Sequence, residues 1–342
     1  MSRSALLVAA VVPFLAPPAA LAHHSQVGIF DSSRTIEITG VIKSVSWRNP
    51  HGRIVLEVEE NGQLVEWDAE TASISILRNR GVEGAAIVVG ERVTIAGAPP
   101  VRNRRELLAR SVLLPSGYEF TFGSAEPYFP AGKAGRIVGR QTIQANVDEA
   151  VRSADGLFRV WSTIMSDPAA FPMFKGGYPL NDAGRAKLAE WNPQDNVLLK
   201  CGTKGMPLIM ISPLPMEFVR QGDDILLRIE EYDVRRLIHM SPDAMPPAEH
   251  SQFGFSRGRW DGNTLVVETT HLAEQYFDHE GVWQSEQVHL VERFTPNAAY
   301  DRLDYTLTVT DPVYFSEPFE LRRYFVWKPE NRVHPYECLD RF

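Results

Sequence analysis

Short segments in which apolar and polar residues alternate, with turn residues between them, make up most of this chain of 342 residues. A period of two predicts β-strands, because successive side chains of a strand point to opposite faces of a sheet. One series of such segments covers residues 35–117, and a second covers residues 156–327. The chain is therefore predicted to be mainly β, with two separate β-units.

The first series has the strand order of an OB-type barrel. Its strands are expected within residues 35–47, 53–70, 89–100 and 107–117, and Asn61-Gly62 splits the second segment into a hairpin. Residues 73–82 predict one short helix, which follows the third strand and ends at Gly81. Five strands with a helix after the third are typical of this fold, so residues 23–123 are predicted to form a five-stranded OB-type β-barrel.

The second series predicts a larger barrel. Consecutive strand segments run through residues 155–342 and favour an antiparallel up-and-down β-barrel or a curved sheet. Residues 124–154 are predicted to be a linker or strap containing a helix over Thr142–Arg152, and Asp182–Trp191 to be another helix. Aromatic residues on the strand segments predict an apolar interior for a small apolar ligand, unless side chains fill it: Trp161, Phe218, Trp260, Tyr305 and Phe325.

The first residues have the pattern of a secretory signal peptide. Arg3 precedes an apolar run over residues 5–16 that is too short to span a bilayer, and Ala20-Leu21-Ala22 is a small-residue cleavage site. We expect residues 1–22 to be removed by cleavage after Ala22. The mature chain would then begin at His23 and be periplasmic.

Charge and cysteine content restrict the partners and the compartment. The chain has 35 basic and 43 acidic residues, and loss of Arg3 leaves a mature balance of 34 − 43 = −9. This sign disfavours nucleic acid and anionic membranes as partners, and no apolar segment after the signal is long enough to span a bilayer. Cys201 and Cys338 are predicted to form one disulfide in an oxidising compartment.

Histidines near the mature N-terminus suggest a copper site. Cleavage after Ala22 would free the amino group of His23, which can chelate a metal together with its own imidazole. His51, placed by Pro50 in the turn between the first two strands, or the adjacent His24 would supply a third nitrogen. Three nitrogens suit Cu(II), and Glu70 is expected to orient an imidazole from behind. The alternative is that His23 and His24 are a remnant of processing.

Two other motifs give weaker predictions. Residues 254–258 match the G-x-S-x-G pattern of serine hydrolases, but a hairpin follows instead of a helix, so Ser256 is predicted to be an ordinary strand residue. His250, His271 and His279 would indicate a catalytic or metal site only if they converged with a carboxylate in one pocket.

Both halves resemble uncharacterised exported bacterial families. HHSQVGIFD, followed by ITGVIKSVSWRNPHG and EWDAE, resembles a family in which HHS, FD, TG and W-x-NPH recur in this order, over residues 23–123. GRWDGNTLVVET, HLVERF and YECLDRF resemble a second family over residues 155–342. This chain departs from the second family where Phe255 replaces a histidine of a GHS element and where WQSEQ replaces PHS.

Two classes of function follow. The first is a periplasmic binding or accessory protein, with copper at the mature N-terminus and a small apolar ligand in the larger barrel. The second is a periplasmic enzyme, either a copper-dependent oxidase or monooxygenase or a hydrolase or isomerase that uses the larger barrel. The first is favoured because no complete catalytic constellation is visible in the sequence, and the catalytic residues of the second are unknown.

Overall fold

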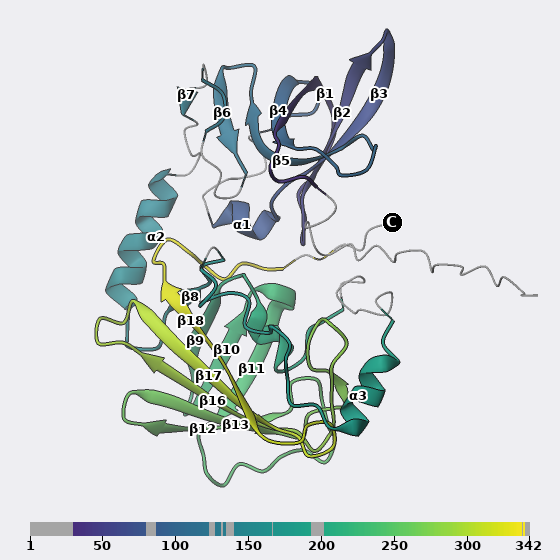
Figure 1. The fold of residues 1–342 in the computed structure, drawn as a ribbon. Coiled ribbons are helices and arrows are strands. Elements are labelled where there is room, and N and C mark those ends of the chain that lie inside the picture. The colour runs from purple at the N-terminus through teal and green to yellow at the C-terminus, as the bar shows by residue number, and fades with distance from the viewer. Residues whose placement is uncertain are drawn as a thin grey trace, which may run out of the picture.

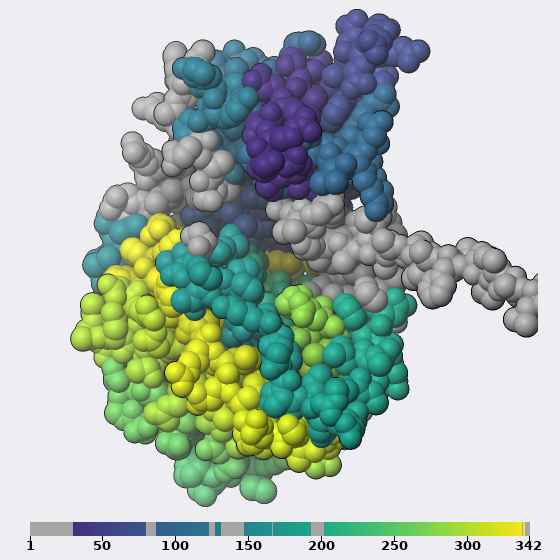
Figure 2. Space-filling model, in the orientation of Figure 1, coloured from purple at the N-terminus to yellow at the C-terminus, as the bar shows by residue number. Residues whose placement is uncertain are grey.

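The computed structural model describes residues 30–79, 87–122, 127–130, 133–134, 140–165, 167–192, 202–336 and 338. The predicted signal peptide, His23, His24 and Cys201 lie outside these residues. The described chain is mainly β, as predicted, and forms two β-units that stack one above the other (Figures 1 and 2). Among the described residues, no helix is both long and apolar enough to cross a membrane.

The first unit is closed by a parallel contact between its third and fifth strands. Its described strands are β1 (Ile36–Ser46), β2 (Arg53–Glu60), β3 (Gln63–Glu70), β4 (Arg92–Ala98) and β5 (Glu106–Leu113). They pair in the order β3-β2-β1-β4-β5, and β3 also pairs with β5. Helix α1 (Ile74–Arg78) follows β3 and begins where the Ser73 side chain accepts a hydrogen bond from the Ile76 amide. The OB-type prediction is confirmed.

Two short strands and a helix connect this unit to the second. Strand β6 (Tyr118–Thr121) extends the sheet beside β5, and β7 (Lys133–Ala134) pairs with β6. The sequence did not predict β7, since two residues are too few to show alternation. Helix α2 (Arg140–Ser153) confirms the predicted helix and leads into the second unit (Figure 1).

The second unit is a closed barrel, as predicted. Its described strands pair in the order β10-β11-β12-β13-β16-β17-β18-β8-β9. Their bounds are β8 (Val160–Ser162), β9 (Met216–Gln221), β10 (Asp224–Ile229), β11 (Val234–His239), β12 (Phe255–Asp261), β13 (Thr264–Thr270), β16 (His289–Pro296), β17 (Arg302–Thr310) and β18 (Phe319–Trp327). Helix α3 (Asp182–Ala189) confirms the second predicted helix, and β14 (Gln275–Tyr276) and β15 (Trp283–Gln284) form a small sheet beside it.

One pair of strands departs from the predicted antiparallel pattern. Strands β11 and β12 are parallel and pair only at Ile238 with Ser256 and at His239 with Arg257. The connection over residues 240–254 returns the chain to the same end of the barrel, which a sequence pattern does not reveal. Strand β12 runs on beyond the end of β11, so its last residues have no neighbouring strand on that side.

Side chains fill the barrel interior. Trp161, Phe218, Tyr305 and Phe325 are all buried in one core cluster, as are the four residues of the 3₁₀ helix η4 (Leu208–Ile211). The rings of Phe218 and Tyr305 both contact Phe294, at centroid distances of 5.1 and 4.9 Å. The sequence left open whether the interior holds a ligand or is filled by side chains. These contacts correspond to a packed core.

A belt of polar side chains also crosses the interior, one from each of five neighbouring strands. Arg236 on β11 donates to both carboxylate oxygens of Glu292 on β16, and its Nε atom donates to Ser256 on β12 at 2.9 Å. Arg236 also donates to Thr269 on β13, and the Tyr305 hydroxyl on β17 donates to Glu292 at 2.9 Å. All five residues are at most 2% exposed. The interior is therefore less apolar than the sequence predicted.

Arg323 on β18 fastens η4 to the barrel wall. Its guanidinium donates to the Met210 carbonyl and to the Thr163 hydroxyl, both at 2.7 Å, and lies 4.2 Å from the Phe325 ring centroid. Burial lowers the pKa of Arg323 to about 10. Among the described residues, no carboxylate oxygen lies within 4 Å of this guanidinium. The charge is held by a carbonyl, a hydroxyl and an aromatic face instead.

Glu292→Gln should lower the free energy of unfolding by about 3 kcal/mol or more, because it leaves Arg236 as an unpaired buried charge. Urea denaturation measures this change. Asp261→Asn is the matched control, since it breaks the exposed Asp261–Arg293 pair between β12 and β16 and should cost less than about 1 kcal/mol. Equal losses in the two variants would show that the buried belt contributes no more than a surface ion pair.

Candidate functional site

The turn over residues 47–52, between β1 and β2, holds His51 in a defined position. Asn49 is fully buried at the start of the turn, and the peptide that joins it to Pro50 is cis. The backbone amide of Thr71 donates to the Gly52 carbonyl at 2.8 Å, and the amide of Gly52 donates to the Ala72 carbonyl at 3.3 Å. A Cβ atom on Gly52 would lie 2.5 Å from the Thr71 hydroxyl, so only glycine fits there. The turn is packed onto the residues that follow β3.

The same packing brings Glu70 to His51. Glu70 is the last residue of β3 and pairs with Arg53, two residues beyond His51. Its Oε1 atom lies 3.5 Å from the Nδ1 atom of His51, and the two side chains are 15% and 27% exposed. A carboxylate beside Nδ1 fixes the ring orientation of an imidazole and favours Nε2 as a metal-binding nitrogen. Both residues were singled out from the sequence, and the fold makes them neighbours.

Barrel closure also places the start of the described chain on the same side of the first unit as Glu70. Phe30, the first described residue, forms a β-bridge with Pro100, just after β4. Across the strands, Ala98 of β4 pairs with Leu108 of β5, and Leu108 pairs with Glu70 of β3. Three strand spacings of about 4.8 Å and two residues along the strand separate Phe30 from Glu70, which amounts to about 16 Å.

The C-terminal tail lies beside the His51 turn. Cys338 forms a parallel β-bridge with Asn49, and Figure 1 shows the tail passing between α1 and the larger barrel. The predicted disulfide partner, Cys201, lies outside the described residues, so that pairing stays a prediction. No sequence pattern predicts that Cys338 returns to the first unit, because the contact joins positions almost three hundred residues apart.

A seam of polar residues joins the two units behind the turn. From the first unit it contains Asn49 and the α1 segment Ser75–Asn79, and from the second unit Glu230–Asp233 and tail residues 332–336. Tyr232 and Asp233 have φ values of 61° and 52°, a left-handed conformation that residues other than glycine rarely adopt. The acidic residues Glu230, Glu231 and Asp233 are the signal that the sequence offers for this seam.

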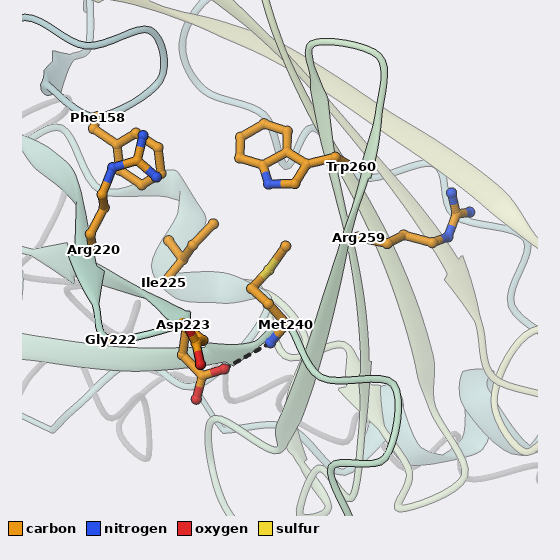
Figure 3. A pocket seen from close by; sticks show the side chains of 9 residues that line it. Phe158, Arg220, Gly222, Asp223, Ile225, Met240, Arg259 and Trp260 are labelled. Atoms are coloured by element: carbon orange, nitrogen blue, oxygen red, sulfur yellow. Dashed lines mark hydrogen bonds between the residues drawn. The ribbon is translucent and has the colours of Figure 1, made fainter.

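A pocket opens at the mouth of the larger barrel, where β12 continues past β11. Its volume is about 410 Å³, and its walls include Phe158, Arg220, Ile225, Met240 and Trp260. In Figure 3 the indole of Trp260 points toward Phe158, while Arg259 points away on the other side of β12. The ring centroids of Trp260 and Phe158 are 6.4 Å apart, and the Arg220 guanidinium lies 3.8 Å from the Phe158 centroid.

Trp260 is exposed rather than part of the packed interior. It is 45% exposed at the pocket, whereas the sequence placed it among the core aromatics. The floor of the pocket is fixed by Asp224, which accepts hydrogen bonds from the Met240 amide at 2.9 Å and contacts His239 at 3.2 Å. The pocket therefore offers an aromatic face and charged groups around a rigid floor.

The other histidines form no metal site with each other in the described parts of the chain. The rings of His250 and His271 stack at 5.3 Å, but no three His, Cys, Asp or Glu side chains gather in a metal-binding arrangement among the residues that the structure describes. Ser256 lies within β12 with its hydroxyl bonded to Arg236 and Thr269. It is a strand residue, as the sequence predicted.

A sequence model of a family of unknown function, DUF6152, matches residues 13–107. The first β-unit is similar to this family. The match includes His23, His24, His51 and Glu70 and ends in β5, but it covers less than a third of the chain. No curated protein matches the chain. The family description names no activity, so the function must be argued from the site.

Proposed function

We propose that this chain is an exported, periplasmic binding or accessory protein that holds copper at the first β-unit. The observation that carries the proposal is the His51–Glu70 pair, an imidazole oriented by a carboxylate in a tightly packed turn. Such pairs recur behind metal-binding histidines because the carboxylate fixes the ring and raises its basicity. Copper would be held by the amino group and imidazole of His23 together with the imidazole of His51.

The length of the N-terminal segment is compatible with this ligand set. Seven residues separate His23 from Phe30 and span at most about 24 Å when extended. Phe30 lies about 16 Å from Glu70 by the strand register, which leaves slack for a bend. Three nitrogens in one plane suit Cu(II). Copper binding at these residues requires no catalytic group elsewhere in the chain.

Blocking the amino group should abolish most of the copper affinity. The processed chain that begins at His23 is titrated with Cu(II) by calorimetry, beside the same chain with its N-terminus acetylated. The acetylated chain should bind far more weakly, and Glu70→Gln in the processed chain should weaken binding by about 10–100-fold. His250→Ala, in the second unit, is the control and should have no effect. Equal affinity of the processed and acetylated chains would rule out the terminal site.

The pocket at the barrel mouth supports a second binding role, for a small molecule with an apolar ring. Trp260 and Phe158 supply aromatic faces, and Arg220 supplies positive charge beside Phe158. Ligand sites commonly combine an apolar lining with a few polar groups that fix orientation. We propose this pocket, rather than the packed interior, as the place for the predicted apolar ligand.

Trp260→Ala should weaken binding of the dye 8-anilinonaphthalene-1-sulfonate by roughly tenfold, equivalent to about 1.4 kcal/mol. The dye has aromatic rings for the pocket and a sulfonate for Arg220, and its fluorescence reports binding. Met245→Ala removes another exposed apolar side chain, 81% exposed and outside the pocket, and should leave the affinity unchanged. Equal losses in both variants, or no saturable binding, would contradict the proposal.

The Cys201–Cys338 disulfide remains part of the proposal for an exported protein. In the chain-entropy model, a bridge that closes so long a loop contributes about 4–5 kcal/mol. Replacing both cysteines by serine should therefore lower the melting temperature markedly. Alkylation followed by mass spectrometry should detect no free thiol in the oxidised, folded protein, and two alkylated cysteines would refute the bridge.

A further inference from the structure

Glu230 is a fully buried carboxyl group at the seam between the two units. It lies at the end of β10, just before the 3₁₀ helix η5 (Glu231–Asp233), and has no exposed surface. Its Oε2 atom accepts hydrogen bonds from the His334 amide at 3.2 Å and from the Asn79 side chain at 3.5 Å. One carboxyl group of the second unit thus contacts both the first unit and the C-terminal tail.

The surroundings of Glu230 do not neutralise a negative charge. Arg78 faces it from α1, and His334 and Tyr336 face it from the tail, while Glu231 on its own side is paired with Lys204. Among the described residues, no side-chain nitrogen of a Lys, Arg or His lies within 4 Å of the Glu230 carboxylate. Burial consequently raises the pKa of Glu230 to about 7, against the lowering effect of its hydrogen bonds.

A row of buried polar atoms without partners runs from Glu230 to the His51 turn. The Oε1 atom of Glu230, the Ser75 hydroxyl and the Nδ2 atom of Asn49 are buried and have no hydrogen bond. Asn49 is linked to Ser75, whose amide donates to the Asn49 side chain at 3.5 Å. An ionised Glu230 would place a buried charge at the end of this row, whereas a protonated Glu230 is neutral there.

We propose that Glu230 is a positioning residue that fastens the tail and the larger barrel to the His51 turn when it is protonated and loosens that seam when it is ionised. The residue acts through Ser75 and Asn49 and does not touch the metal. The fastening itself needs no copper. Only its effect on copper binding rests on the proposed function.

The sign of the pH effect follows from the direction of the pKa shift. An acid whose pKa is higher in the closed seam than its ordinary value of 4.5 stabilises the closed form at low pH. This contribution is lost as the pH rises from 4.5 to about 7, and the two values correspond to a change in the closing equilibrium of up to about 300-fold. Glu230 should therefore favour the closed seam in mildly acidic solution, whereas burial, which lowers the pKa of His334 in the tail, acts in the opposite direction.

Hydrogen exchange of the full processed chain tests the proposal, with rates corrected for the intrinsic pH dependence. The amides of Arg332, Val333, His334 and Tyr336 should be more protected at about pH 5 than at about pH 8.5. Glu230→Gln, which cannot ionise, should remove this pH dependence. Asp233→Asn is the matched control: its carboxylate accepts from the Tyr336 amide, so the variant should lose some protection but keep the pH dependence.

Two results would overturn the fastening: equal protection of the tail at both pH values in the unaltered chain, or undiminished pH dependence in Glu230→Gln. Should Glu230→Gln fail to fold, carboxyl ¹³C titration of the unaltered protein decides instead, since a Glu230 midpoint near its ordinary value contradicts the proposal. Copper titration at both pH values is a separate readout. No copper binding at either pH would remove the proposed function and leave the exchange result to decide the fastening.

Discussion

The parallel pairing of β3 with β5 is the contact on which the arrangement of the first unit depends. Residues Asp68–Glu70 lie against Glu106–Leu108, and this pairing turns a sheet with two open edges into a barrel. It also sets the end of β3 within a few strand spacings of Phe30. Without it, Glu70 would lie at a free sheet edge, and the N-terminal segment and the His51 turn would be on opposite sides of an open sheet.

The sequence predicted the fold well wherever the alternation was local and regular. β-branched alternation predicted the strands of both barrels, and Ile74, Leu77 and Gly81 predicted the short helix that is typical of an OB-type order. What it missed depends on long-range placement. Alternation places Arg236 and Glu292 on the core-facing side of their strands, but it does not show that each neutralises the other there, since they are 56 residues apart. The parallel β11–β12 contact likewise depends on a connection whose path no pattern records.

The candidate site, too, could be predicted only where the signals are local in the sequence. His51 and Glu70 are recognisable in the sequence because Pro50 and the end of a strand give each a defined position. Asn49, Ser75 and Glu230 are not, since they matter only through a contact between two units and a returning tail. The strained backbone at Tyr232 and Asp233 belongs to this contact, and such strain persists only where the surrounding structure holds it. The larger barrel therefore serves the first unit as a rigid support as well as carrying a pocket of its own.

Pulsed electron paramagnetic resonance of the Cu(II)-loaded, processed chain tests the central claim most directly, because it detects the remote nitrogen of each coordinated imidazole. With ¹⁵N-labelled histidine, the account predicts signals from two imidazoles, those of His23 and His51, and loss of one of them in His51→Ala. A spectrum with one imidazole, or an unchanged spectrum in His51→Ala, would contradict the claim that the turn and the mature N-terminus share one metal ion.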